Sequence, residues 1–284
     1  MSSAGTILSG EYLADRAVAA LRDAAELTPK PGLADGRGPG VHRDITREML
    51  HASAEALRPT FERYVAAARK LVVGVELRAE LGRIGRSGEA AMLKATEGVN
   101  THRGSLWSLG LLCTGAANAA SAGRIALVAA KLARIADPAV SPAGDAPTYE
   151  AEVSRHERVR GVVGEARAGF PHITFLALPT LLLARESGFT EPTARLHVLL
   201  TLMARLDDTT ILDRGGMTGL ISVQSSAQSV LNAGGPQTPS GRTQLHILDR
   251  LCRDEGLSPK GSGDLLAATL FLATVLEELA LRMR

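Results

Sequence analysis

The chain has 284 residues, of which 45% are hydrophobic and 22% are charged, so it can form a substantial core and is not expected to be disordered. Its 32 basic and 30 acidic residues leave a net charge of +2, which excludes the broad basic surface of a nucleic-acid-binding protein. With 3% aromatic residues, the chain also lacks the stacking rings of a single-strand binder. Any polyanionic ligand is therefore expected to bind at a local cluster of groups.

The two cysteines, Cys113 and Cys252, match no metal or redox spacing and indicate reduced thiols in a cytoplasmic protein. Residues Met1–Gly10 lack the basic stretch and apolar core of a signal peptide. The stretch between Arg103 and Arg124 contains no charged residue and is long enough to span a bilayer. Because this stretch is rich in Gly, Ala, Ser and Thr, a buried central helix is favoured over a membrane span.

Apolar residues recur at helical spacing, and the alternation typical of strands is not sustained. The sequence therefore predicts an all-α fold, with residues 1–284 in a single compact multi-helix domain. The predicted helices are Ser9–Glu26, Arg43–Leu57, Thr60–Gly82, Gly88–Thr96, His102–Ile135, Thr148–Ala168, Ile173–Glu186, Glu191–Asp207, Gly216–Leu231, Gly241–Glu255 and Gly263–Arg282. Loops rich in Pro and Gly are expected at Thr28–Gly40 and Asp137–Pro147.

Polar residues and glycines first gather between Thr28 and Asp44. Lys30 stands between two prolines, which favour a stiff and extended backbone at that position. The glycines of this loop can present backbone N–H groups to a phosphate. An ordinary surface loop has the same composition, so both interpretations stay open. The candidate side chains here are Lys30, Asp35, His42 and Asp44.

The second polar segment, Gly98–Gly104, precedes the long apolar stretch. Asn100 or Thr101 can cap the helix that follows, and the free N–H groups of its first turn form an anion site. His102 and Arg103 stand beside that site. A plain helix cap with exposed charges is the alternative interpretation.

The third segment holds Asp207 and Asp208, followed by Arg214, Gly215 and Gly216. Adjacent carboxylates at a helix end can hold Mg²⁺, which prefers oxygen ligands and often keeps substrate phosphates in its shell. An arginine can form paired hydrogen bonds to a phosphate. The alternative is a solvated helix end with a glycine-rich turn.

The fourth segment, Ser258–Asp264, opens the last predicted helix. Ser262 is the predicted N-cap, and Asp264 in the first turn satisfies the helix dipole. From the residues alone, this structural role of Asp264 is favoured over a catalytic one.

In this order, the segments resemble the triphosphoribosyl-dephospho-CoA synthases. Thr28–Gly32 with His42 and Asp44 is similar to the opening motif of that family, and Gly98–Gly104 is similar to its most distinctive motif. Glu165 with Ala168–Pro171, Asp207–Thr209, Arg214–Gly216 and Ser258–Asp264 follow in the expected order. The resemblance runs from about Glu11 to Leu272, and its last motif is similar to the malonate decarboxylase branch rather than the citrate lyase branch. Glu97, Lys260 and Gly263 depart from the family's pattern.

The resemblance implies an all-helical enzyme that transfers the 5-triphosphoribosyl group of ATP to the 2′-hydroxyl of 3′-dephospho-CoA and releases adenine. The product is the precursor of the prosthetic group on the acyl carrier subunit of malonate decarboxylase. That subunit, or the transferase that loads it, is an expected partner. Mg²⁺ is expected to accompany the triphosphate.

The resemblance also implies roles for the residues of the four segments. The predicted substrate contacts are Lys30, Asp35, His42, Thr101, Arg103, Arg214, Gly215, Gly216, Ser262 and Asp264. The predicted catalytic residues are Asp44, Asn100, His102 and Asp208, and the predicted Mg²⁺ ligands are Asp207, Asp208 and Glu89. Two alternatives stay open: a nucleotide or ADP-ribose glycohydrolase that uses water as the acceptor, and a non-catalytic helical module that binds the carrier protein.

Overall fold

The protein, here a computed structural model, is described over residues 7–119, 121–139 and 161–284, and the regular elements in these ranges are helices. They are α1 (Gly10–Glu26), α2 (Arg47–Ala56), α3 (Arg58–Lys70), α4 (Val75–Ala95), α5 (Arg103–Ala116), α6 (Ala122–Arg134), α8 (Gly161–Ala168), η2 (His172–Ala177, a π-helix), α9 (Leu178–Glu186), α10 (Glu191–Met203), α11 (Thr209–Asn232), α12 (Pro239–Asp254) and α13 (Lys260–Arg282). An isolated β-bridge joins Asp35 and Gly38. The predicted all-α fold of one compact domain is confirmed.

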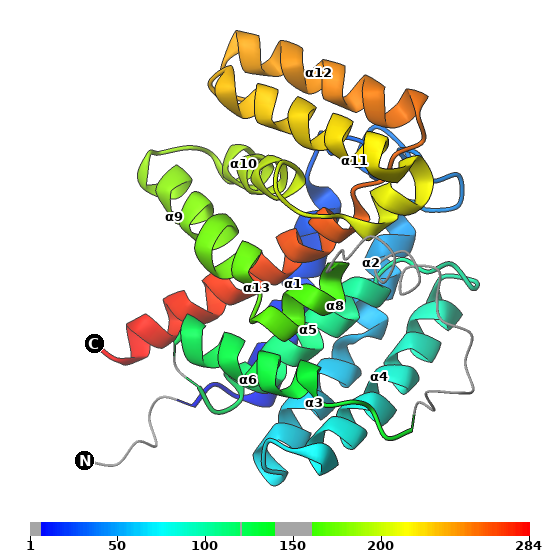
Figure 1. Ribbon diagram of the computed structural model, residues 1–284. Helices are drawn as coiled ribbons and strands as arrows, with labels where there is room; N and C mark the ends of the chain where they lie inside the picture. Colours follow the sequence, from blue (N-terminus) through cyan, green and yellow to red (C-terminus); the bar gives the residue numbers. More distant parts are fainter. Residues whose placement is uncertain (1–6, 120, 140–160) are drawn as a thin grey trace.

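The core is built around α5 and α13, whose side chains are buried on nearly all sides. Leu109 and Leu112 of α5 and Leu265 and Phe271 of α13 are fully buried. A helix that is apolar all round is expected at the centre of a domain. α1 packs against both of these helices. Figure 1 shows α13 running through the middle of the molecule, whose one end is formed by α11 and α12 and whose other end is formed by α3 and α4. The uncharged stretch after Arg103 thus begins as a buried central helix, as predicted.

The predicted helices Thr60–Gly82 and Gly88–Thr96 are wrong, because the chain turns at residues 71–74 instead. Gly88 lies inside α4 rather than at a helix start. A Cβ at this position would lie 2.6 Å from the Thr60 side chain, so the glycine lets α4 pack closely against α3. The apolar residues of this turn resemble a helix interior in the sequence, yet Val72 is 88% exposed in the structure.

The single helix predicted over His102–Ile135 is also divided, into α5 and α6. α6 folds back on α5, and a Cβ at Gly115 would lie 2.6 Å from the carbonyl oxygen of Ile125. The Asn118 side chain between the two helices donates to the carbonyl oxygen of Ala68, at 2.9 Å. Close helix contact at a glycine therefore decides where the chain reverses.

Several helix ends differ from their predicted positions, and capping side chains set the starts of α2 and α12. α2 begins at Arg47 rather than Arg43, since the Thr46 hydroxyl accepts from the Met49 N–H at 3.2 Å. α12 begins at Pro239 rather than Gly241, after the Thr238 cap. α10 ends at Met203 rather than Asp207. Residues 140–147 of the predicted second loop and 148–160 of the helix predicted at Thr148–Ala168 lie outside the described residues.

Replacement of Ser9 by alanine is expected to lower the free energy of unfolding by about 1 kcal/mol. The Ser9 hydroxyl caps α1 by accepting from the Tyr12 N–H at 3.0 Å. Chemical denaturation followed by circular dichroism measures the loss. Ser9→Asp, which can make the same cap, should stay within about 0.5 kcal/mol of wild type. Equal losses in both variants would contradict the capping role.

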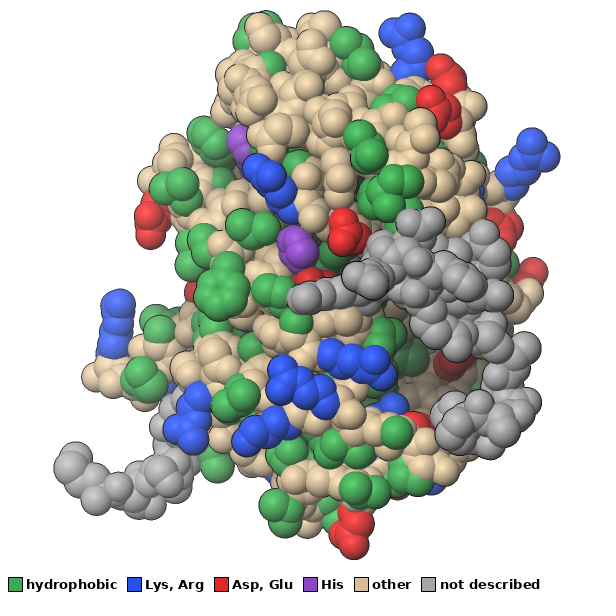
Figure 2. Space-filling model, viewed as in Figure 1, with side chains coloured by type: hydrophobic (Ala, Val, Ile, Leu, Met, Phe, Trp, Pro, Cys, Tyr) green, Lys and Arg blue, Asp and Glu red, His purple; other side chains and the backbone are tan. Residues whose placement is uncertain are grey.

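The excess of basic residues is not spread evenly over the surface. Figure 2 shows Lys and Arg side chains gathered over the region of α6, where Arg124, Lys131, Arg134 and the nearby Arg167 are exposed. Within the described ranges, no single helix combines the length and apolar composition needed to cross a membrane. The helices Gly161–Ala168 and His172–Glu186 meet those two criteria only as a pair bent by 77°.

Candidate active site

Three of the four polar segments meet in one cleft bounded by α1, the loop after it, α5 and α13. The polar side chains that line it are those of Lys30, His42, Thr101, His102, Ser105, Lys260 and Asp264. Leu21, Ile45 and Leu266 are among its apolar walls. The cleft has a volume of about 70 Å³, which holds a small group rather than a whole nucleotide. Most of a bound nucleotide would therefore lie in the open mouth of the cleft.

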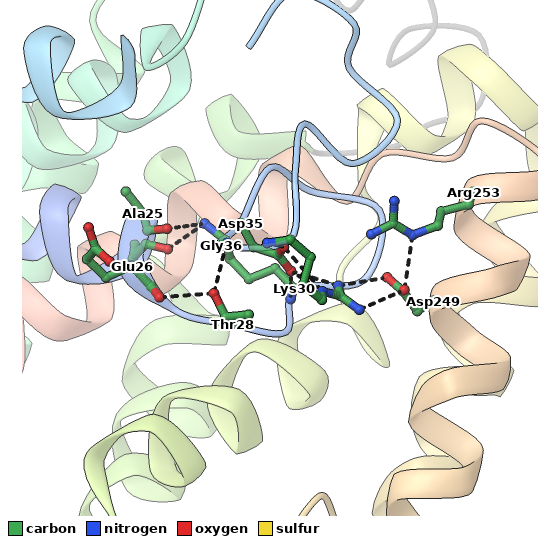
Figure 3. A network of polar contacts seen from close by, with 10 residues as sticks. Ala25, Glu26, Thr28, Lys30, Asp35, Gly36, Asp249 and Arg253 are labelled. Carbon is green, nitrogen blue, oxygen red and sulfur yellow. Dashed lines mark hydrogen bonds and ion pairs between the residues drawn. The ribbon is translucent and has the colours of Figure 1, made fainter. Parts of the chain in front are cut away.

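Lys30 is buried at the C-terminus of α1, where its ammonium group meets backbone carbonyls (Figure 3). Its Nζ donates to the carbonyl oxygens of Ala24 at 2.7 Å and Ala25 at 3.1 Å. These carbonyls lie in the last helical turn and have no partner within the helix. Burial, partly offset by the charges of Asp35 and Glu26, lowers the pKa of Lys30 to about 8. Lys30 thus closes a helix end and presents a cation to the cleft.

Asp35 shapes the loop that carries Lys30 and is not among the residues that line the cleft. Its Oδ2 accepts from the Lys30 N–H at 2.7 Å, and Arg37 pairs with it at 2.7 Å. Arg37 also pairs with Asp249 of α12 at 2.9 Å, and Asp249 pairs with Arg253 (Figure 3). Burial alone would raise the pKa of Asp35, but the donors from Arg37 and Lys30 hold it below its usual value. Sequence reasoning missed Arg37 and Asp249, because only the fold brings them together.

The residues of the Gly98–Gly104 segment point to two different sides of the start of α5. The Asn100 side chain accepts from the Arg103 N–H at 3.1 Å and so satisfies one donor at the start of α5. The N-cap is His102 rather than the predicted Asn100 or Thr101, and its side chain makes no capping hydrogen bond. Thr101 and His102 line the cleft, and Arg103 turns away to pair with Glu89 of α4. The Nζ of Lys260 donates to the Asn100 carbonyl at 2.8 Å and joins this segment to α13.

His102 is buried and held by a chain of hydroxyl groups. The Thr101 hydroxyl donates to Ser53 Oγ at 2.7 Å, and Ser53 Oγ lies 2.7 Å from His102 Nδ1. Since Ser53 accepts from Thr101, its own proton is available to Nδ1, which leaves the ring proton on Nε2. Burial, reinforced by the charges of Lys260 and Lys30, lowers the pKa of His102 to about 3. The imidazole is therefore neutral at pH 7, and Ser53 is a further residue of the site that the sequence did not indicate.

His42 links the first segment to the fourth, since its Nε2 lies 2.7 Å from Ser258 Oγ. Burial, reinforced by the charges of Arg214 and Lys260, lowers the pKa of His42 to about 4, against the opposing charge of Asp44. Arg214 is exposed, and its Nη1 donates to the Gly256 carbonyl at 3.0 Å. The guanidinium of the third segment thus lies near enough to His42 to act on it by charge, although Arg214 is not among the residues that line the cleft.

Asp208 is buried between the N-termini of α11 and α13. Its Oδ2 accepts from the N–H of Ser262 at 2.9 Å and from the Ser262 hydroxyl at 3.2 Å, and its Oδ1 accepts from the Thr210 N–H at 3.1 Å. Burial raises the pKa of Asp208 to about 6, although these donors oppose the rise. α11 consequently begins at Thr209 rather than at Gly216, which lies inside it at a kink with φ +60°. Gly215, next to the kink, packs against Leu257.

α13 begins at Lys260, so the predicted N-cap role of Ser262 and first-turn position of Asp264 are wrong. Asp208 satisfies the first N–H groups of this helix in place of a local serine. Asp264 is instead directed toward α5, where it accepts from the buried Ser105 hydroxyl. It lines the cleft as a buried carboxylate. Ser105 is another site residue that the sequence did not indicate.

The structure does not bring the predicted Mg²⁺ ligands together. Within the described ranges, no group of three or more His, Cys, Asp or Glu residues is placed to hold a metal ion. Asp208 faces the start of α13, and Glu89 pairs with Arg103. Asp207 is exposed and has no hydrogen bond or ion pair with another described residue.

The buried Glu165 and the partly buried His172 form a hydrogen-bonded pair near Asp207. His172 Nδ1 lies 2.7 Å from Glu165, and its Nε2 lies 3.2 Å from the Arg205 carbonyl. The hydrogen bond to Glu165 raises the pKa of His172, and the charge of Asp207 adds to the rise. His172 also opens the π-helix η2, an element that often marks functional sites.

The buried neutral His102 is expected to make the protein sensitive to acid. An unfolded histidine binds a proton near pH 6.5, whereas His102 in the folded protein does so only near pH 3. As the pH falls from 6.5 to 5.5, the free energy of unfolding of the wild type should therefore decrease by up to about 1.4 kcal/mol more than that of His102→Gln. Denaturant titrations at several pH values measure this difference, and a gap that stays constant with pH would contradict a neutral His102.

Comparison with known proteins identifies the family of this chain. The sequence profile of the ATP:dephospho-CoA triphosphoribosyl transferases matches residues 10–283. The chain belongs to this family. It is 47% identical over 267 residues to a probable 2-(5″-triphosphoribosyl)-3′-dephosphocoenzyme-A synthase of Stutzerimonas stutzeri, covering 93% of this chain and 91% of the relative. No solved structure matches the chain.

Two further relatives match this chain over at least 90% of their own length. A probable synthase of the same name from Pseudomonas fluorescens is 49% identical over 267 residues, 92% of this chain and 90% of the relative. The 2-(5″-triphosphoribosyl)-3′-dephosphocoenzyme-A synthase of Klebsiella pneumoniae is 45% identical over 270 residues, 93% of this chain and 94% of the relative. The expectation that this chain is a transferase of this family is confirmed.

Proposed function

We propose that this transferase moves the 5-triphosphoribosyl group of ATP onto the 2′-hydroxyl of 3′-dephospho-CoA and releases adenine. The family assignment supports the reaction. The observation that carries it at the level of residues is the meeting of Lys30, Thr101, His102 and Asp264 from three distant segments in one cleft. Such convergence is what a site that holds one nucleotide requires.

The reaction is a displacement at the anomeric carbon C1′ of ATP, with an oxocarbenium-like transition state. The acceptor hydroxyl loses a proton to a base, and the departing adenine needs a hydrogen-bond donor or an acid. His102 suits the second task as a neutral donor through Nε2 rather than as an imidazolium, because of its low pKa. Asp264, a buried carboxylate that lines the cleft, suits stabilisation of the positive ribose.

The remaining predicted residues take positions around this centre. Lys30 and Arg214 supply positive charge near the cleft for the triphosphate, and Arg103 reaches the neighbouring side of α5. Asp44 is exposed beside His42 and is the candidate base at the cleft's mouth. Asn100 orients the start of α5. The proposed Mg²⁺ would be held by Asp207 and substrate phosphates, where it would neutralise phosphate charge.

The biological setting extends the proposal. The final motif, Ser258–Asp264, favours the malonate decarboxylase branch, whose acyl carrier subunit, or the transferase that loads it, would be the partner downstream. The cytoplasm is the compartment that fits Cys113 and Cys252, which are buried free thiols.

Incubation of the protein with ATP, Mg²⁺ and 3′-dephospho-CoA, followed by mass spectrometry, tests the proposed reaction. Free adenine and the coupled product should appear in equal amounts, and only when both substrates are present. Adenine released without an acceptor would instead support the glycohydrolase alternative. Absence of ATP binding and of adenine would support the non-catalytic module.

A further inference from the structure

A second and larger cavity lies between α4 and α5, on the other side of the Gly98–Gly104 segment. It measures about 190 Å³, compared with about 70 Å³ for the first cleft. Its lining residues include Tyr64, Arg78, Arg86, Arg103, Trp107 and Asp137. We call it the tryptophan cleft. Thr101 and His102 face the first cleft and the next residue, Arg103, faces this one, so a single segment separates the two cavities.

The tryptophan cleft carries a small excess of positive charge. Three arginines, Arg78, Arg86 and Arg103, line it against two carboxylates, Asp137 and Glu89. Asp137 is shared by Arg78 at 3.3 Å and Arg86 at 2.8 Å. The side chains of Arg86 and Arg103 are 48% and 49% exposed, so both can reach a ligand at the opening. Guanidinium groups in this position suit the paired oxygens of a phosphate.

Trp107 adds a ring and an unused donor. Its indole lies under the guanidinium of Arg78, whose carbon is 5.2 Å from the ring centre. The buried Trp107 Nε1 has no hydrogen-bond partner among the described residues. Buried indole N–H groups usually have an acceptor. The indole N–H is therefore a donor that the described residues leave unsatisfied within the wall of the tryptophan cleft.

Glycines shape the floor of the tryptophan cleft. A Cβ at Gly85 would lie 2.7 Å from the Tyr64 hydroxyl, and a Cβ at Gly110 would lie 2.5 Å from the Tyr64 ring. Both glycines stand within helices, where glycine lowers helix stability by about 1 kcal/mol relative to alanine. They allow the Tyr64 ring to lie between α4 and α5 below the cavity.

We propose that the tryptophan cleft binds the adenosine diphosphate part of the acceptor, 3′-dephospho-CoA, while the first cleft binds ATP. This inference rests on the proposed function, since a reaction that joins two nucleotides needs two sites with a shared boundary. Three arginines against two carboxylates suit a diphosphate diester, which carries two charges, better than a free triphosphate. The acceptor would then approach the ATP ribose across the Asn100–Arg103 segment.

Trp107 makes the inference directly measurable, because it is the only tryptophan of the chain. Titration with 3′-dephospho-CoA should change the intrinsic fluorescence in a saturable way, and titration with ATP should leave it nearly unchanged. Trp107→Phe gives the background signal. A saturable response to ATP alone, or no response to 3′-dephospho-CoA, would overturn the assignment.

Arg86→Ala is the kinetic test, and Arg83→Ala is its matched control. Arg83 stands on the same helix and pairs with Glu80 in a similarly exposed position, but it does not line the cleft. Arg86→Ala should raise the KM for 3′-dephospho-CoA about tenfold with the KM for ATP unchanged, and Arg86→Lys should recover part of the loss. Arg83→Ala should resemble wild type, and circular dichroism checks the fold of each variant.

The outcomes separate this inference from the proposed reaction. If 3′-dephospho-CoA changes the Trp107 fluorescence but no coupled product forms, the reaction is wrong and the binding site stands. If product forms and Arg86→Ala retains the wild-type KM for 3′-dephospho-CoA, or raises only that for ATP, the site assignment is wrong and the reaction stands.

Discussion

Replacement of His102 by alanine is expected to lower kcat/KM for triphosphoribosyl transfer by roughly a hundredfold or more. The imidazole lines the first cleft, and the hydroxyls of Ser53 and Thr101 hold it in one orientation. A neutral donor fixed in a buried site stabilises developing charge without reorganising, and loss of one such donor commonly costs this much. Adenine release under saturating 3′-dephospho-CoA, measured by chromatography, gives the rate.

His246→Ala is the control for this variant, because His246 is an exposed histidine on α12, away from both cavities. Its turnover should equal that of wild type. The turnover of Ser53→Ala should lie between those of His102→Ala and wild type, since this substitution removes the hydrogen bond to the imidazole but leaves the ring in place. Turnover of His102→Ala within about twofold of wild type, with normal helical circular dichroism, would remove His102 from the mechanism.

Asp208→Ala is expected to lower the free energy of unfolding by about 3 kcal/mol or more. The substitution leaves the buried N–H groups of Ser262 and Thr210 without their acceptor and separates the N-termini of α11 and α13. Each buried donor left unsatisfied costs about 1 to 3 kcal/mol. Guanidinium denaturation monitored by circular dichroism measures the change.

The adjacent Asp207→Ala is the matched control, because the same substitution falls on an exposed carboxylate one residue away. It should change the free energy of unfolding by less than about 0.5 kcal/mol and raise the Mg²⁺ concentration needed for half-maximal activity. If Asp208→Ala keeps near-native stability and instead needs more Mg²⁺ for half-maximal activity, Asp208 is a metal ligand rather than a structural residue.

The sequence alone determined the all-α class and the identity of the segments that build the site. Helical spacing with few strand signals is a local property, and so is the run of small uncharged residues that buries α5. The hydrogen bond from the Arg103 N–H to the Asn100 side chain spans three residues and is likewise a local feature. The order of the polar segments along the chain was enough to indicate the family.

Only the tertiary structure decided the roles of the charged residues, because a carboxylate's role depends on which donors the fold places around it. Asp207 and Asp208 are indistinguishable as a sequence pair, yet one is exposed and the other joins two helix N-termini. Asp264, predicted as a dipole partner of its own helix, faces Ser105 of α5 instead. The turns that divide α3 from α4 and α5 from α6, and the tryptophan cleft that these turns help to form, arise from helix contacts that no local pattern encodes.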